Sequence, residues 1–544
     1  MSQSATMTGS LNILIGDKLS EAGIELLRNT EGVHVDIKTG LGEDELAEIV
    51  GNYDGMIIRS GVKATAKVLA NPGRLRVISR AGVGVDNVDL DAATKGGVLV
   101  MNSAEASTIT TAEHAFTLMM ALARNIGPAY KKMTEGGWDR NKFVGRQLNG
   151  RTLGLVGLGR IGRTVAERAL AFGMKVLAFD PVFNADTACD GQVKLVKSFD
   201  ELISKIDFLS FHVPLNDHTR NMLGADQFER AKPGLMVINA ARGGVIDTDA
   251  LLAALESGKC AGAAIDVYEK EPLEEDSPLR NHPKILLTPH LGASTEEAQE
   301  AVSNSACEQA LEYLQGKGIR GAVNAAGVRL DLEPKQLSYV DLAQRMARLI
   351  APMVESTIQE IVVTCQGESL VGAASTIERM ALVEVLNSLL DVPINVVNAE
   401  LLAEQRGIKI SSVIEGQPRA IARVIIDITT KDQPRRIAGA IYQDGKPRVL
   451  EINGYHMDMV PDGPMVLLLN EDRPGMIGLV GNEFGGAGAN ISDMALSRRG
   501  DTAMMLLNLD QTPDAALLNR LRARPGILKI LSVQLPELAV ADNS

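Results

Sequence analysis

The chain has 544 residues, too many for a single hydrophobic core, so we expect three or four domains. Its formal net charge of −13 argues against a surface for nucleic acid or for an anionic membrane, although a few local cations suffice to bind a small anionic substrate. The 4 cysteines lack C-x-x-C spacing, which argues against a disulfide framework or a metal site and favours a reducing cytoplasm. No apolar run is long enough to span a bilayer, and the polar start of the chain predicts no signal peptide.

Strands alternate with helical segments in the first part of the chain. Bounded apolar runs predict strands at 11–16, 34–39, 54–60 and 76–80, and the alternation restarts at Arg151 with strands at 152–157, 175–180, 207–215, 235–241 and 262–268. Such alternation implies βα units and two parallel sheets. Residues 110–126 predict an apolar helix that crosses between domains or packs in a dimer. Residues 294–316 predict a helix that returns the chain to the first domain.

The remainder of the chain has a different pattern. Residues 330–455 mix helical stretches with short strands, and residues 464–536 predict the order βαββαβ of a ferredoxin-like domain. The predicted fold is therefore α/β, with two doubly wound, Rossmann-type parallel-sheet domains followed by an α+β domain and a ferredoxin-like domain. The predicted boundaries are 10–103 with 298–327, 104–297, 328–458 and 464–538.

A glycine-rich turn follows the strand at 152–157 and opens a helix. Its glycines, Gly157, Gly159 and Gly162, have the spacing that permits a tight turn, close approach of a pyrophosphate and close packing of helix on strand. A plain glycine turn is the alternative reading. Asp180 argues against that reading, because it ends the next strand, where a carboxylate accepts a hydrogen bond from a ribose hydroxyl and repels a 2′-phosphate. The sequence therefore predicts an NAD site and disfavours NADP.

Three further residues suggest chemistry on a hydroxy acid. His290 is a candidate general base, and a carboxylate at Glu271 or at Glu269 could orient its ring; local sequence leaves that choice open. Arg242 ends an apolar strand, where its guanidinium suits a substrate carboxylate. A core or surface histidine and a surface salt bridge are the alternative readings. Asp266 ends a neighbouring strand and could accept a hydrogen bond from the nicotinamide amide.

These motifs lie in blocks that carry a family resemblance, at residues 80–102, 152–162, 238–244, 263–272 and 288–299. The chain resembles the D-isomer-specific 2-hydroxyacid dehydrogenase family, and within it the long-form phosphoglycerate dehydrogenases. The resemblance implies that His290 is the general acid/base with Glu271, rather than Glu269, as its partner, and that Arg242 anchors the carboxylate. It implies an NAD site made of Gly157, Gly159, Arg160, Ile161, Gly162, Asp180, Val213, Ala240, Ala241, Asp266, Gly292 and Ala293.

The resemblance also implies a substrate and a reaction. Substrate-binding positions would be Arg59, Ser60, Val83, Ser107 and Arg140, the last reaching a neighbouring subunit's site. The extra cations suit a phosphate, so the implied reaction is oxidation of 3-phospho-D-glycerate to 3-phosphooxypyruvate with NAD, the first step of L-serine biosynthesis. The alternatives are a hydroxypyruvate/glyoxylate or 2-oxoglutarate reductase, or a non-enzymatic NAD-sensing protein. Formate oxidation is disfavoured, because formate enzymes of this fold have glutamine where this chain has Glu271.

The last two domains resemble the intervening domain and the ACT domain of the long-form enzymes. ACT domains often bind amino acids at dimer interfaces, which implies L-serine as an effector and a homodimer or homotetramer. The implied effector residues are Asn470, Asp472, Gly475 and Asn490. Asn470 and Asp472 differ from the histidine and asparagine of serine-inhibited short relatives, whereas Asn490 matches.

Overall fold

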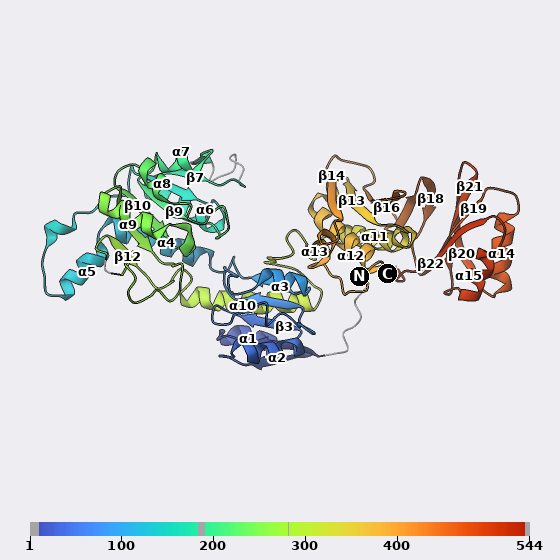
Figure 1. The fold of residues 1–544 in the computed structure, drawn as a ribbon, viewed down its shortest axis with the longest axis horizontal. Helices are drawn as coiled ribbons and strands as arrows, with labels where there is room; N and C mark the ends of the chain where they lie inside the picture. The colour runs from blue at the N-terminus through green and yellow to red at the C-terminus, as the bar shows by residue number, and fades with distance from the viewer. Residues whose placement is uncertain (1–9, 183–190, 281, 539–544) are drawn as a thin grey trace.

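A computed structural model describes residues 10–182, 191–280 and 282–538 of the chain (Figure 1). The described residues form four sheets, each belonging to a separate unit. In Figure 1 the second unit and the fourth unit lie at opposite ends of the long axis, with the first and third units between them. No helix among the described residues is long and apolar enough to cross a membrane.

The first unit is built on a five-stranded parallel sheet in the order β2-β1-β3-β4-β5. The return of the chain to this unit is confirmed, because α10 packs against α1, β3 and β4. Thr295 caps the N-terminus of α10, and its side chain accepts a hydrogen bond from the backbone N–H of Ala298. The elements are β1 (Leu11–Ile15), α1 (Glu21–Arg28), β2 (Val33–Ile37), α2 (Glu43–Ile49), β3 (Gly55–Ile58), β4 (Val77–Arg80), α3 (Leu90–Lys95), β5 (Leu99–Asn102) and α10 (Glu296–Leu314).

The second unit is a seven-stranded parallel sheet in the order β12-β11-β10-β9-β6-β7-β8, with a buried apolar cluster on each face. This is the predicted doubly wound arrangement, although the short edge strands β8 and β12 were not predicted. Three residues are too few to show a clear hydrophobic pattern. The elements are α4 (Thr108–Ala123), α5 (Ile126–Thr134), β6 (Thr152–Val156), α6 (Arg160–Ala171), β7 (Lys175–Phe179), β8 (Val193–Leu195), α7 (Phe199–Ile203), β9 (Phe208–Phe211), α8 (Ala225–Arg230), β10 (Leu235–Asn239), α9 (Thr248–Ser257), β11 (Cys260–Ile265) and β12 (Ile285–Leu287).

The third unit has a six-stranded mixed sheet in the order β14-β13-β15-β16-β17-β18. Only β13 and β14 are parallel within it, and α11 packs against α12 and the middle strands. The predicted α+β class is therefore correct. The elements are α11 (Pro334–Ile350), β13 (Ile358–Gln366), α12 (Ala374–Asn387), α13 (Ala399–Glu404), β14 (Lys409–Glu415), β15 (Arg423–Thr430), β16 (Arg435–Ile441), β17 (Pro447–Ile452) and β18 (Tyr455–Met459).

The fourth unit has the predicted βαββαβ order and a four-stranded antiparallel sheet, β20-β21-β19-β22. Arg345 of α11, only 4% exposed, ties this unit to the third. Its guanidinium pairs with Asp341 at 2.6 Å and donates to the carbonyls of Pro461 and Pro536, which lie just before β19 and just after β22. The elements are β19 (Pro464–Glu471), α14 (Met476–Gly486), β20 (Ile491–Arg499), β21 (Thr502–Leu509), α15 (Ala515–Arg522) and β22 (Ile527–Gln534).

Candidate active site

The candidate site residues of the second unit follow the carboxyl ends of its parallel strands. Because these ends share one edge of the sheet, segments far apart in sequence meet there. The glycine loop follows β6, and Asp180, Val213, the 240–242 turn, Asp266 and His290 follow β7, β9, β10, β11 and β12 in that order. In the first unit, Arg59 with Ser60 and Val83 likewise follow strands β3 and β4.

The glycine loop leaves space where a pyrophosphate must approach. Gly157 has a φ of +91°, and a Cβ there would lie 2.5 Å from the carbonyl oxygen of His212. A Cβ on Gly162 would lie 2.2 Å from the carbonyl oxygen of Gly157, whereas a Cβ on Gly159 would meet no atom within 4 Å. The first and third glycines thus permit the tight turn, and the second keeps the backbone open at the N-terminus of α6. The residues present therefore fit a dinucleotide.

Asp180 lies beside this loop and helps to shape it. Its Oδ2 accepts a hydrogen bond from the backbone N–H of Leu158 at 2.8 Å, and its Oδ1 accepts one from Val182 at 2.9 Å. The carboxylate is thereby held next to the glycine loop, where a ribose would follow the pyrophosphate. Arg160, at the start of α6, pairs with Glu105 at 2.7 Å.

His290 and Glu271 are in direct contact. The Nδ1 of His290 lies 2.7 Å from Oε2 of Glu271, while Oε1 of Glu271 accepts a hydrogen bond from the backbone N–H of Tyr268 at 3.0 Å. The imidazole is 53% exposed and its residue has a φ of +57°. The structure thus resolves the choice that local sequence left open, because the carboxylate at the ring is Glu271, not Glu269.

One buried and one partly buried side chain hold the loops that carry this pair. Asp266 is fully buried, and its two carboxylate oxygens accept hydrogen bonds from the backbone N–H groups of Leu291 at 2.8 Å and Gly292 at 3.0 Å. The hydroxyl of Tyr268 lies 2.8 Å from the carbonyl oxygen of Thr288, to which it donates. Burial, together with the charges of Asp266 and Glu271, raises the pKa of Tyr268 to about 12, so its proton remains available for this bond.

Arg242 faces a group of charges from the first unit. Its Nε donates to Oδ2 of Asp86 at 3.0 Å, and its Nη1 donates to the carbonyl oxygen of Ala241 at 2.7 Å. Arg80, at the end of β4, lies beside them. Burial and then the nearby charge of Arg242 lower the pKa of Arg80 to about 10, and the charge of Asp86 opposes that shift. The arrangement can therefore hold an anion between the two units.

Arg80 and Asp86 were not among the predicted site residues. Both lie in the block at 80–102, and Arg80 ends a strand in the same way as Arg59 and Arg242 do, which is the signal that could have identified it. Asp17 was also missed. Its Oδ2 accepts hydrogen bonds from the backbone N–H groups of Arg59 at 2.6 Å and Val62 at 3.1 Å, so it shapes the loop after β3.

Two predicted substrate residues have no hydrogen bond or ion pair with this group among the described residues. Ser107 is buried at the start of α4, and its hydroxyl has no hydrogen-bond partner among the described residues. Arg140 is exposed and lies in a short 3-10 helix, Arg140–Phe143, beyond α5. In Figure 1 α5 projects from the end of the second unit that faces away from the first unit. Arg140 follows this projecting helix, and no hydrogen bond or ion pair joins it to His290 or Arg242 in the part of the chain that the structure describes.

Comparisons with known proteins agree with these observations. Residues 116–292 match the NAD-binding domain of D-isomer-specific 2-hydroxyacid dehydrogenases, residues 336–453 match the D-3-phosphoglycerate dehydrogenase intervening domain, and residues 465–526 match the ACT domain. D-3-phosphoglycerate dehydrogenase of Archaeoglobus fulgidus is 37% identical over 530 residues, which cover 96% of this chain and 100% of that protein. The enzyme of the same name from Bacillus subtilis is 35% identical, covering 96% of this chain and 99% of that protein. The chain belongs to the D-3-phosphoglycerate dehydrogenase family. It is accordingly an NAD-dependent 2-hydroxyacid dehydrogenase.

Solved structures match the catalytic part of this family member. A glyoxylate reductase from Paecilomyes thermophila shares 32% identity at a TM-score of 0.54, covering 58% of this chain and 99% of that one. The D-lactate dehydrogenase of Aquifex aeolicus, solved with NAD and lactic acid, shares 28% identity at a TM-score of 0.50, covering 56% of this chain and 96% of that one.

The candidate effector residues of the ACT unit do not form one cluster within the chain. Asn470 is buried on β19 opposite Ala503, and its Oδ1 has no partner among the described residues. Asn490 lies at the far end of β21, where its Nδ2 donates to Asp510 at 2.8 Å. The strand between them separates the two residues by about 20 Å. Asp472 pairs with Arg498 at 3.3 Å, and Gly475 precedes α14 with a φ of +90°.

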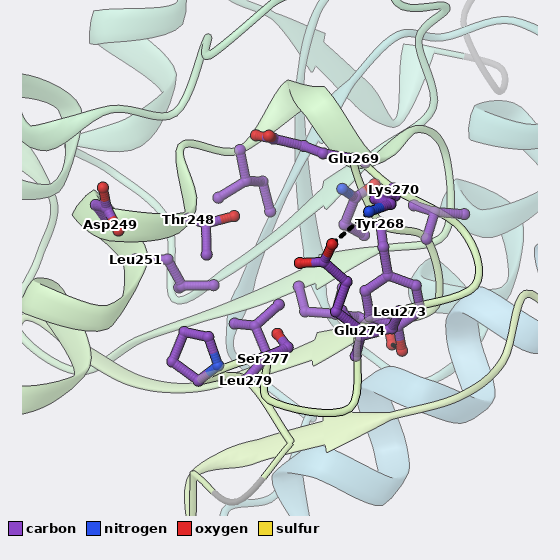
Figure 2. A pocket seen from close by; sticks show the side chains of 16 residues that line it. Thr248, Asp249, Leu251, Tyr268, Glu269, Lys270, Leu273, Glu274, Ser277 and Leu279 are labelled. Carbon is purple, nitrogen blue, oxygen red and sulfur yellow. Dashed lines mark hydrogen bonds and ion pairs between the residues drawn. The ribbon is translucent and has the colours of Figure 1, made fainter.

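A cavity lies on the other side of the loop that carries Glu271. Figure 2 shows its wall, formed by residues 267–270, 273–274 and 277–279 and by the start of α9, with Lys270 paired to Glu274. Its volume is about 310 Å³. Neither His290 nor Arg242 lines it, so the cavity is separate from the catalytic cleft of the family.

Proposed function

We propose that this enzyme oxidises 3-phospho-D-glycerate to 3-phosphooxypyruvate with NAD, the first step of L-serine biosynthesis, in the cytoplasm. The single observation that carries the proposal is the contact of His290 with Glu271 at 2.7 Å, on the same edge of the sheet as Arg242, which pairs with Asp86 of the first unit. The relatives that match nearly the whole chain, which are named D-3-phosphoglycerate dehydrogenase, support the choice of substrate.

The proposed chemistry assigns one task to each residue. With its Nδ1 bonded to Glu271, His290 can take the substrate's hydroxyl proton through Nε2. Glu271 keeps the ring in this orientation and stabilises the positive charge that forms. Arg242 binds the substrate carboxylate through its planar guanidinium. NAD, when bound, supplies the acceptor for the two electrons and the hydrogen removed from C2.

We propose that the remaining arginines of the site bind the phosphate of the substrate. Arg59 and Arg80 lie at the ends of neighbouring strands of the first unit, and the charges of Arg242 and Arg59 both help to lower the pKa of Arg80. We propose Arg140 of a second subunit as a further phosphate ligand. The supporting observation is that α5 has no buried side chain, while Tyr130, Trp138 and Val144 along the same projecting segment are largely exposed. Such apolar exposure fits a homodimer or homotetramer.

The remaining proposals concern regulation and domain limits. An L-serine effector bound by both Asn470 and Asn490 would need the two residues from different ACT units, because one chain holds them at opposite ends of β21. The proposed domain limits are 10–103 with 298–327, 104–297, 328–458 and 464–538. The four separate sheets support this division.

The decisive experiment combines a substrate panel with one variant. 3-Phosphoglycerate should have a higher kcat/KM with NAD than glycerate, lactate or 2-hydroxyglutarate. His290→Ala should lower kcat by ~10²–10⁴, the usual contribution of general acid–base catalysis. His218→Ala, at an exposed histidine of the second unit, is the matched control and should retain activity. A preference for hydroxypyruvate or 2-oxoglutarate would assign the alternative reductase activity. NADH binding without turnover of any substrate would overturn the proposal.

A further inference from the structure

His114 contacts the buried carboxylate behind the His290 loop. It lies on α4, and its Nε2 is 3.1 Å from Oδ1 of Asp266 and 3.4 Å from Oγ1 of Thr288. The histidine side chain is 16% exposed and the aspartate is fully buried. This contact belongs neither to the glycine loop nor to the contact between His290 and Glu271, and no sequence motif singled it out.

The carboxylate of Asp266 forms hydrogen bonds to residues on both sides of His290 in the turn. Its Oδ1 accepts from the hydroxyl of Thr288 at 2.6 Å and from the backbone N–H of Leu291 at 2.8 Å, and its Oδ2 accepts from Gly292 at 3.0 Å. The carboxylate therefore holds the residues on both sides of His290, which has the left-handed φ of +57°. For a residue other than glycine this conformation persists only where the surroundings enforce it.

A fully buried carboxylate needs hydrogen-bond donors, because burying an unpaired charge is costly. Burial raises the pKa of Asp266, but hydrogen bonds from His114, Thr288 and Leu291 outweigh that effect and leave the pKa below its ordinary value. An ionised carboxylate only accepts hydrogen bonds, so the contact requires a proton on Nε2 of His114. Helix α4 packs against α6, β10 and β11, so His114 connects the loop carboxylate to a fixed element.

We propose that His114 is a positioning residue for the proposed reaction. By donating to Asp266, it fixes the carboxylate that holds Leu291 and Gly292, and through them the ring of His290. The proposal rests on the function proposed for His290. It predicts that loss of the donor slows turnover through a looser turn at 288–292, while substrate affinity, which Arg242 dominates, changes little.

The test compares variants that differ in the donor. His114→Gln keeps an N–H at nearly the depth of the imidazole Nε2, His114→Asn places its N–H short of Asp266, and His114→Leu has none. His114→Leu should lower kcat ~10-fold, as expected for loss of a hydrogen bond to a charged group, with KM changed less than threefold. His114→Asn should lower kcat as much as His114→Leu does. Because asparagine is polar, this variant still tests the inference if the leucine variant does not fold. His114→Gln should recover most of the loss.

Hydrogen exchange provides a readout that needs no turnover. In the NAD-free enzyme, amide exchange in the peptide covering residues 288–293 should be faster in His114→Leu and His114→Asn than in wild type, and close to wild type in His114→Gln. Glu113→Gln is the matched control, because Glu113 is the adjacent residue of α4 and pairs with Arg168 on the helix surface at 3.1 Å. It should leave both exchange and kcat unchanged.

Three results would overturn the inference: unchanged exchange and kcat in His114→Leu and His114→Asn, a glutamine variant no better than the leucine variant, or a fall in kcat without a change in exchange. Failure of the proposed function gives a different pattern. In that case wild type itself turns over no 2-hydroxy acid, whereas the exchange rates of the variants still report on the turn.

Discussion

Arg242 and Asp86 join the first and second units across the cleft, with Nε of the arginine 3.0 Å from Oδ2 of the aspartate. Gly84 makes room for this contact, since a Cβ there would lie 2.0 Å from Nη2 of Arg242. The proposed anchor for the substrate carboxylate thus binds a carboxylate of its own chain. Because Asp86 is 68% exposed, solvent screens the pair and a substrate can replace it at modest cost.

Asp86→Asn should therefore strengthen anion binding. Removing the competing charge should lower KM for the hydroxy acid about two- to fivefold, the range that an exposed pair allows. Steady-state kinetics at saturating NAD measure the effect. Asp91→Asn, at an exposed acid on α3 nearby, controls for the change in net charge and should leave KM unaltered. An unchanged or higher KM in Asp86→Asn would show that Asp86 does not compete with the substrate.

Glu271→Gln should lower kcat ~10–10²-fold. A neutral amide can still accept from Nδ1 of His290, but it cannot stabilise the imidazolium that forms as the proton is taken. Glu269→Gln is a closely matched control, because Glu269 is exposed two residues away and has no contact with His290 among the described residues. Equal losses in the two variants would argue for a general effect of charge rather than a specific partner.

Asp180 should set the preference for NAD over NADP. Asp180→Asn keeps the shape of the side chain and one acceptor oxygen but removes the charge, so the ratio of kcat/KM for NAD to that for NADP should fall by at least ~10-fold. Asp180→Ala also removes the acceptor for Leu158, and should lose NAD affinity as well. If the two variants have equal cofactor ratios and equal NAD affinity, the hydrogen bond to Leu158 has no part in shaping the loop.

The described cysteines should be unreactive in the folded enzyme. Burial raises the pKa of Cys260, Cys307 and Cys365 to about 12, so the thiolate is scarce and reagents have no access to it. Cys189 lies outside the described residues, so the measurement needs a Cys189→Ser background. In that background, a thiol-reactive dye should label no cysteine in native protein and 3 after denaturation. Rapid labelling of the native form would contradict the burial of these side chains.

His212 should make the enzyme sensitive to mild acid. Burial lowers the pKa of His212 to about 4, below its ordinary 6.5, so the folded chain keeps the ring neutral where the unfolded chain takes up a proton. The stability that this group contributes is fully present above about pH 6.5 and is lost as the pH falls toward 4. His212→Asn should therefore show a smaller fall in melting temperature between pH 7 and pH 5 than wild type. His218→Asn, an exposed histidine six positions later, should match wild type.

Much of the fold was predictable because its signals are local. The apolar runs of β1, β6, β10 and β11, the glycine turn and the βαββαβ order of the last unit each depend on neighbouring residues. The strands β5, β8, β12, β13, β14 and β18 were missed. The four shorter ones have three to five residues and carry little periodicity, whereas β13, with 9 residues, alternates buried with less buried positions and was overlooked. The cofactor-binding positions were also predictable from local sequence. They lie just after the carboxyl ends of strands, and each of those strands can be recognised from its own residues.

By itself, the sequence determined the sheet classes, the glycine loop, the acid at the end of β7 and the family. The family resemblance favoured Glu271 as the carboxylate beside His290, but only the tertiary structure showed that contact, the acid that pairs with Arg242 and the histidine that supports Asp266. Those pairs are separated by 19, 156 and 152 residues along the chain. The physical reason is the range of the interactions. Strand and turn preferences act between near neighbours, whereas a hydrogen bond of about 3 Å depends on how the sheet edge and the two units bring distant segments together.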